Sequence, residues 1–75
     1  MAISYNKLWK RLIDQNLTKM EMMHQSKISS NVLARLGKNK PVSMESMEKI
    51  CRTLKCDIGD VMEFIPDDAD GGRSE

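Results

Sequence analysis

The sequence is poor in the residues that build sheet cores, membrane spans and secretion signals. Its 75 residues include three aromatics, Tyr5, Trp9 and Phe64, and no run of β-branched residues, so a large β-sheet core is disfavoured. No stretch of 18 apolar residues occurs, which argues against a transmembrane helix. The N-terminus also lacks the apolar core and cleavage site of a signal peptide. We therefore expect a soluble, cytoplasmic protein.

Residues that bind metals or perform catalysis are also few. Cys51, Cys56 and His24 suit a metal, but a zinc site usually needs four ligands in paired spacing. A reducing compartment disfavours a Cys51–Cys56 disulfide. No nucleophile with a base and an orienting group, glycine loop for phosphate or carboxylate pair with a pocket is recognisable. We expect no metal, no cofactor, no small-molecule substrate and no enzymatic activity.

The 40% hydrophobic content suits one small helical domain. One helix-start signal recurs five times: an apolar residue, a capping residue, and a second apolar residue four positions after the cap. The caps are Ser4, Thr18, Ser29, Ser43 and Asp57. We therefore predict an all-α, compact five-helix domain over residues 1–66, with Phe64–Pro66 as its extended apolar end. Residues 67–75 are acidic and contain glycine, and they are expected to form a flexible tail.

Helical periodicity predicts which residues enter the core. In the first helix one apolar stripe is formed by Tyr5, Leu8, Trp9, Leu12 and Ile13. In the fourth it is formed by Met47, Ile50, Cys51 and Leu54. Asn16 and either Gly37 or Asn39 are expected to end helices with a left-handed backbone.

The net charge of +1 conceals a strong asymmetry along the chain. Residues 1–56 carry eleven basic side chains against four acidic ones, a charge of +7, whereas residues 57–75 carry one against seven, a charge of −6. A basic body with an acidic tail is typical of a protein whose body meets a polyanion. The alternative is solvated surface charge that has this distribution by chance.

Residues 18–36 predict two short helices joined by a tight turn. The helix starts at Thr18 and Ser29 are about 11 residues apart, which allows roughly two helical turns and a short connection. This is the spacing of a helix-turn-helix. We expect Glu21 to complete a capping box with Thr18, and Leu33 and Leu36 to face the core.

The helix over about residues 29–37 places polar side chains where DNA reading requires them. Asn31 can pair with adenine, Arg35 with guanine, and Ser30 with several bases, since a recognition helix enters the major groove by its N-terminal residues. Phosphate contacts are expected at Thr18, Lys19, Lys38, Asn39 and Lys40. The alternative is an ordinary helix start, with Arg35 in a surface salt bridge.

Residues 17–39 resemble the helix-turn-helix of the Cro/C1-type (XRE-like) regulators. The family pattern is met by Thr18, Glu21, Met22, Ile28, Ser29, Leu33 and Leu36, and residues 43–65 are similar to its fourth and fifth helices. The resemblance covers about residues 3–66. It implies a lambda-repressor-like fold and a transcriptional regulator, expected to be a repressor, that binds a palindromic operator in double-stranded DNA as a homodimer. The base contacts that it implies, at Ser30, Asn31 and Arg35, agree with those above. It also implies phosphate contacts at Lys19, Lys38 and Lys40, and a further one at Ser29.

The chain departs from the family pattern at three positions, where Lys19 replaces Gln, Met23 replaces Ala and Lys27 replaces Gly. For Lys27 we expect either a recast turn or a left-handed backbone that costs about 1 kcal/mol. The competing interpretation of the whole chain is a small protein-interaction module, antitoxin-like, in which an apolar surface with Phe64 and Ile65 recruits a partner and DNA contact is secondary.

Overall fold

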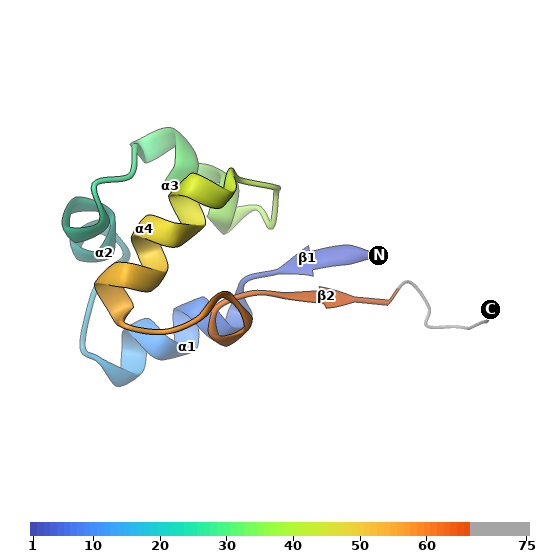
Figure 1. Ribbon diagram of the computed structural model, residues 1–75, viewed down its shortest axis with the longest axis horizontal. Coiled ribbons are helices and arrows are strands. Elements are labelled where there is room, and N and C mark those ends of the chain that lie inside the picture. Colours follow the sequence, from blue (N-terminus) through green and yellow to red (C-terminus); the bar gives the residue numbers. More distant parts are fainter. Residues whose placement is uncertain (67–75) are drawn as a thin grey trace.

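The computed structural model describes residues 1–66; the expected acidic tail, residues 67–75, lies outside the described residues. The helices are α1 (Asn6–Asp14), α2 (Lys19–Ser26), α3 (Ser30–Gly37) and α4 (Met44–Leu54), followed by a 3₁₀ helix (Ile58–Asp60). Strands β1 (Ala2–Ser4) and β2 (Glu63–Ile65) pair antiparallel. The helices form one body from which the two strands project as an arm (Figure 1). In residues 1–66 no helix has the length and apolarity needed to cross a membrane.

Four α-helices of the expected five-helix, all-α fold are confirmed. At both ends of residues 1–66 the structure differs from the expectation. The fifth helix is a single 3₁₀ turn, because the residues that follow it extend and pair with β1. The first helix does not start at Ser4, which lies in β1 and is buried; Tyr5 precedes α1 without a side-chain cap. Ser4 Oγ instead accepts a hydrogen bond from the Asn6 N–H at 3.3 Å.

The other four predicted caps are confirmed. Thr18 Oγ1 accepts from the Glu21 N–H at 3.0 Å, and Glu21 Oε1 accepts from the Thr18 N–H at 2.9 Å. Ser29 Oγ accepts from Val32 N–H at 3.2 Å, and Ser43 Oγ accepts from Ser46 N–H at 3.1 Å. Asp57 forms a capping box with Asp60. Side chains therefore satisfy N–H groups that helix starts leave unpaired.

The core lies between the helices and the 3₁₀ turn, and α2 packs against α4. Its fully buried large side chains are Tyr5, Leu8, Met22, Leu36, Met47, Ile50 and Val61. Cys51 and Trp9 are half-buried against this core. The expectation for Ile13 is wrong: its side chain is 73% exposed. It precedes the last residue of α1, Asp14, and lies off the buried face formed by Leu8 and Leu12.

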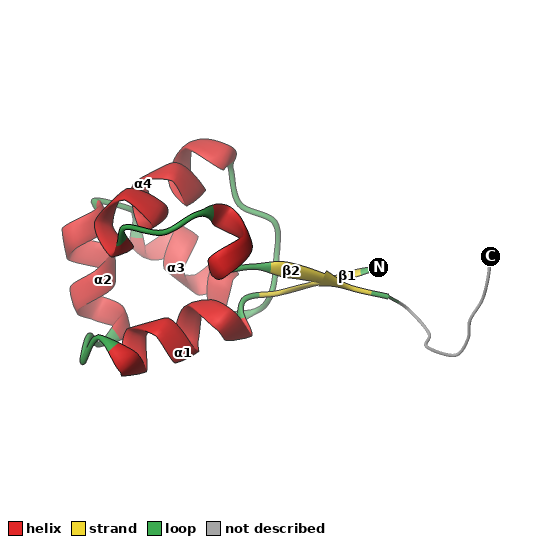
Figure 2. Cartoon of the chain, turned by 60° about the horizontal axis from the view of Figure 1, so that its bottom comes forward, coloured by secondary structure: helices red, strands yellow, loops and turns green. Residues whose placement is uncertain are grey.

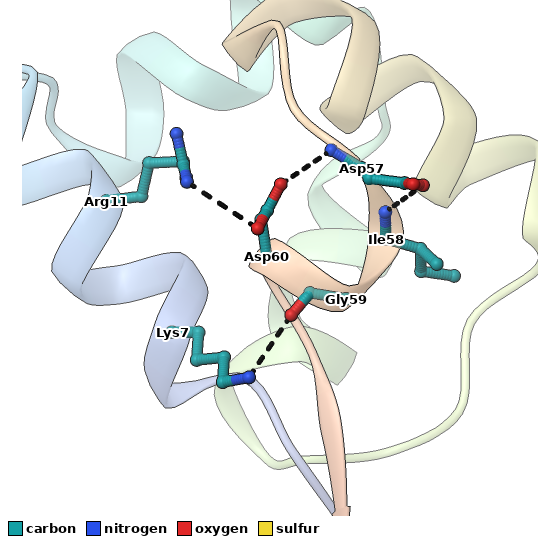
Figure 3. A network of polar contacts seen from close by, with 6 residues as sticks. All are labelled: Lys7, Arg11, Asp57, Ile58, Gly59 and Asp60. Atoms are coloured by element: carbon teal, nitrogen blue, oxygen red, sulfur yellow. Dashed lines mark hydrogen bonds and ion pairs between the residues drawn. The ribbon is translucent and has the colours of Figure 1, made fainter.

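Both strands of the arm are fixed to the helical body at their inner ends. After β1, the Tyr5 hydroxyl donates to the Lys40 carbonyl at 2.7 Å, and the Tyr5 N–H donates to Asn39 Oδ1 at 3.3 Å. Before β2, the 3₁₀ turn contacts α1: Lys7 Nζ donates to the Gly59 carbonyl at 3.2 Å (Figure 3). Arg11 lies 4.0 Å from the Asp60 carboxylate in the same network (Figure 3). The arm is thus positioned relative to both α1 and the loop after α3.

Candidate nucleic-acid interface

Three residues connect α2 to α3. Lys27 adopts the left-handed conformation with φ 61° and ψ 37°, so the turn is not recast, and the strained alternative expected for this residue is the one present. The Lys27 N–H donates to the His24 carbonyl at 3.3 Å, and the Ile28 N–H donates to the Met23 carbonyl at 3.2 Å. The Ile28 side chain is buried in the core and anchors the turn there. Ser29 then caps α3.

Met23 occupies the position where the family pattern has a smaller residue. Its side chain is 7% exposed and lies in the core with the fully buried Met22. The methionine side chain is unbranched and adaptable, which suits an irregular space between helices. The α2–α3 unit therefore buries this larger side chain without losing either helix.

The outer face of α3 carries the three predicted base-contacting residues, and all of them are exposed: Ser30, Asn31 and Arg35. Leu36 behind them is fully buried, and Leu33 packs against the core, as expected. Among the ion pairs of residues 1–66, none involves Arg35, so the salt bridge considered as an alternative is not formed there. The guanidinium makes one long hydrogen bond, 3.4 Å, to the Pro41 carbonyl.

Two of these base-contacting candidates share a surface with two of the phosphate-contacting candidates. Asn31 and Arg35 line a shallow hollow of about 210 Å³ together with Lys38 and Lys40. The lysines enter this hollow because the loop after α3 turns back at Asn39, whose φ is 57°. Two cationic side chains thus border an Asn and an Arg, an arrangement that can hold a phosphate backbone while base edges are read.

The other residues predicted to contact phosphates already make contacts within the protein. Thr18 and Ser29 use their hydroxyl oxygens as helix caps, which leaves each hydroxyl proton for a further hydrogen bond. Asn39 uses Oδ1 to bind the Tyr5 N–H, which leaves its NH₂ group to donate. Lys19 Nζ lies 4.4 Å from the centroid of the Trp9 ring, a cation–π distance. This contact holds the side chain of Lys19, the first residue of α2, against Trp9 of α1.

Two residues that hold this surface in place were not predicted from the sequence. Tyr5 connects β1 to the loop after α3, and Trp9 positions Lys19. Both contacts join residues that are distant in the sequence, so helical periodicity places Tyr5 and Trp9 in the core without identifying their partners. The left-handed backbone at Lys55, φ 57°, was also not expected, because lysine carries no signal for it.

The metal and disulfide alternatives gain no support from the geometry of residues 1–66. Within them, no three His, Cys, Asp or Glu side chains lie close enough together to hold a metal ion. Cys51 and Cys56 are free thiols. Burial raises the pKa of the Cys51 thiol to about 11, and neighbouring Cys56 and the carboxylates of Asp57 and Asp60 add to the increase. At neutral pH this thiol is protonated, and the protonated form is a poor ligand and nucleophile.

Comparison with known proteins assigns the family. Residues 7–67 match the model of the Cro/C1-type HTH DNA-binding domain, and because the match covers most of the chain, the protein belongs to this family of DNA-binding proteins. The crystal structure of transcriptional regulator VanUg is similar to the chain, with a TM-score of 0.84 and 44% sequence identity over 88% of this chain and 88% of that chain. No curated protein matches the chain. The resemblance stated from the sequence is confirmed.

Proposed function

We propose that the protein is a sequence-specific transcriptional regulator that acts as a repressor, binding a palindromic operator as a homodimer with α3 in the major groove. The observation that carries this proposal is the exposed polar face of α3, with Ser30, Asn31 and Arg35 above the buried Leu36 in a complete helix-turn-helix. The 44% identity to transcriptional regulator VanUg supports the regulatory role. Repression follows when a bound dimer blocks access to a promoter.

Three residues of α3 each contact a different base. Arg35 donates a pair of hydrogen bonds to guanine, and Asn31 pairs with adenine, each worth about 1–3 kcal/mol of discrimination. Ser30, at the first position of α3, contacts the adjacent base. Arg35 is free to reorient because its contact with the Pro41 carbonyl, at 3.4 Å, is at the long limit of a hydrogen bond.

Phosphate contacts flank this face and set the register on the duplex. Lys38 and Lys40, together with the Asn39 amide, bind phosphates of one DNA strand beside the hollow. Thr18 and Lys19 bind a second phosphate at the N-terminus of α2, where backbone N–H groups and the helix dipole favour an anion. The Ser29 hydroxyl donates to a third phosphate at the N-terminus of α3.

A dimer provides the affinity that one small domain lacks. In this arrangement two copies place their α3 helices in successive major grooves, about 34 Å apart. Each half-site then contributes its own phosphate and base contacts, and the operator is a palindrome because the protein dimer is two-fold symmetric.

The first experiment selects bound sequences from random DNA with the full chain, and the expected result is a palindrome. In binding titrations, Arg35→Ala and Asn31→Ala are each expected to weaken operator binding by about 1–3 kcal/mol and to reduce sequence preference. Lys38→Ala, the matched control, is expected to weaken all sequences equally and to reduce the salt slope by about one. A selection without sequence preference, or an Arg35→Ala variant that weakens operator and random DNA equally, contradicts the proposal.

A second candidate, the protein-interaction module, is favoured by the exposed apolar side chains Phe64 and Ile65 of β2. Salt dependence distinguishes the two functions. DNA binding through several phosphates weakens steeply with rising salt, whereas binding of a partner through apolar contacts changes little.

A further inference from the structure

A second hollow, of about 310 Å³, lies where the end of α2 meets the C-terminal half of α4, and it shares no lining residue with the hollow beside α3. The helices α2 and α4 pack against each other and lie side by side in both views, and the arm projects away from the side that α2 occupies (Figures 1 and 2). Each side chain that lines this α2–α4 hollow carries a hydrogen-bond donor, and none is acidic: Gln25, Ser26, Lys27, Lys49, Arg52 and Thr53. None of them is among the residues predicted to contact DNA.

Two of the three cationic groups at the α2–α4 hollow have no acidic partner within residues 1–66. Lys27 and Lys49 take part in none of the ion pairs formed there. Arg52 lies 2.7 Å from the Glu48 carboxylate, one turn earlier in α4. The hollow therefore has an excess of about two positive charges, which attracts an anion.

The helix dipoles account for only part of this charge. Lys27 ends α2, and Arg52 lies in the last turn of α4, where a cation is favourable. Lys49 lies more than one turn before the end of α4, and the dipole effect falls off within the last turn. An anionic ligand between the two helices accounts for all three cations.

The ammonium group of Lys27 is held at this hollow by a strained backbone. Its φ of 61° is in the left-handed region, which glycine adopts without strain and lysine does not. Glycine would form the turn more easily, so the turn itself does not require a lysine. Residues kept in strained conformations cluster at ligand sites and functional turns, which indicates that the lysine side chain has a role at the hollow.

Ser26 is the buried polar residue of the hollow. It is 4% exposed, and its Oγ has no hydrogen-bond partner within residues 1–66. A serine in a helix often donates to the carbonyl four residues earlier, and this bond is not formed here. Buried polar atoms without a partner are rare, and a bound ion is one of their explanations. The hydroxyl proton can rotate towards an acceptor in the hollow that Ser26 lines.

We propose that the α2–α4 hollow binds the phosphate group of a small molecule. A phosphate monoester carries nearly two negative charges and three strong acceptor oxygens, which match two ammonium groups surrounded by hydroxyl and amide donors. A planar carboxylate is matched instead by the fork of one arginine, and the fork of Arg52 already binds Glu48. A hollow of this volume has room for the organic part of a small ligand. The site adjoins the α2–α3 turn at Lys27, so a bound ligand stabilises this turn.

Titration of the full chain with inorganic phosphate, at an ionic strength kept constant with chloride, tests the site by ¹⁵N–¹H correlation NMR. The N–H signals of Ser26, Lys27 and Thr53 are expected to shift and to saturate. Lys49→Gln and Lys27→Gly are each expected to weaken binding roughly fivefold, because each removes a charge-assisted hydrogen bond. Lys10→Gln, on the exposed surface of α1, is the matched control for the lost charge. Shifts that do not saturate at the hollow, or equal affinity of Lys49→Gln and Lys10→Gln, overturn the proposal.

The Ser26→Ala variant separates binding of the ligand from folding. Without phosphate, it is expected to be at least as stable as the wild type, because a buried hydroxyl without a partner is removed. Phosphate stabilises the wild type by binding to its folded state, and it is expected to stabilise the variant less. Urea denaturation with and without phosphate measures both effects. An equal gain in stability for the two proteins overturns the assignment.

Further titrations identify the source of the phosphate group. Ribose 5-phosphate is expected to bind at least as tightly as inorganic phosphate, and ribose is expected not to bind. A random DNA duplex is expected to leave ribose 5-phosphate bound. Its displacement by DNA assigns the hollow to the DNA backbone, and tighter binding of a glutamate-rich peptide assigns it to an acidic protein partner; either result overturns the small-molecule site. Neither result affects base reading by α3, which the selection of DNA sequences tests separately.

Discussion

Four residues other than glycine adopt a left-handed backbone within residues 1–66: Asn16, Lys27, Asn39 and Lys55, with φ between 57° and 61°. Asparagine tolerates this conformation because its short polar side chain can bond locally. Lysine does not, and a left-handed L-residue costs roughly 1–2 kcal/mol. Lys27 and Lys55 keep the conformation because each ends a helix, α2 and α4 respectively, and allows the chain to turn at once. Single residues thus store strain at the turn that defines the DNA-binding unit.

Lys27→Gly is expected to increase the free energy of unfolding by up to about 1 kcal/mol, because glycine adopts positive φ without strain. Urea denaturation followed by circular dichroism measures the change. Lys27→Ala is the matched control, since it removes the same charge and keeps the Cβ atom. The explanation by strain is refuted when the two variants have the same stability.

At the scale of elements, the helices of the DNA-binding unit are too short to be stable alone. The α2 and α3 helices have 8 residues each, below the length at which isolated helices persist in water. They are held by packing of Met22, Ile28 and Leu36 in the core and by side-chain caps. The capping box of Thr18 and Glu21 is one of these local contributions, with both of its hydrogen bonds formed.

Thr18→Ala is expected to lower the free energy of unfolding by about 1 kcal/mol, because the Glu21 N–H loses its acceptor. Glu21→Gln is the control, since an amide oxygen also accepts from the Thr18 N–H, and its stability is expected to remain close to that of the wild type. Thermal and urea unfolding report both values. A Thr18→Ala variant as stable as Glu21→Gln shows that the cap contributes little to α2.

At the scale of the whole molecule, the distribution of charge affects the affinity for DNA more than it affects the fold. Residues 1–56 carry a net charge of +7 and residues 57–75 a net charge of −6. Residues 67–75 contribute four of the acidic groups. At low salt, where charges act over long distances, these groups compete with DNA phosphates for the basic surface.

Removal of residues 67–75 is therefore expected to raise the affinity for random DNA at low salt, and to have a smaller effect at 0.2 M salt, where the Debye length is below about 10 Å. Fluorescence anisotropy with a labelled random duplex measures both. A full-length control with Asp67, Asp68, Asp70 and Glu75 changed to their amides is expected to behave like the truncated chain. Unchanged affinity in both variants dismisses the competition.

Features that depend on residues close together in the chain could be predicted from the amino-acid sequence. Four of five caps, the α2–turn–α3 spacing and most of the core stripe were correctly predicted, because a cap or an amphipathic helix depends on residues three to seven positions apart. The left-handed backbone of Lys27 was one of two alternatives that its position in the turn allowed. The exposure of Ser30, Asn31 and Arg35 agrees with the predicted face, and their roles as base contacts stay predictions.

The arm of β1 and β2 and its connection to the loop after α3 depend on contacts between distant segments, and the sequence did not predict them. Ala2–Ser4 extends because it pairs with Glu63–Ile65 at the other end of the described chain, and such pairing has no local signal. The same holds for the Tyr5–Lys40 hydrogen bond and for the hollow shared by Asn31, Arg35 and two lysines. Ser4 has the local pattern of a helix cap, but the strand partner and the burial of its side chain prevail, because contacts between distant segments outweigh one capping hydrogen bond.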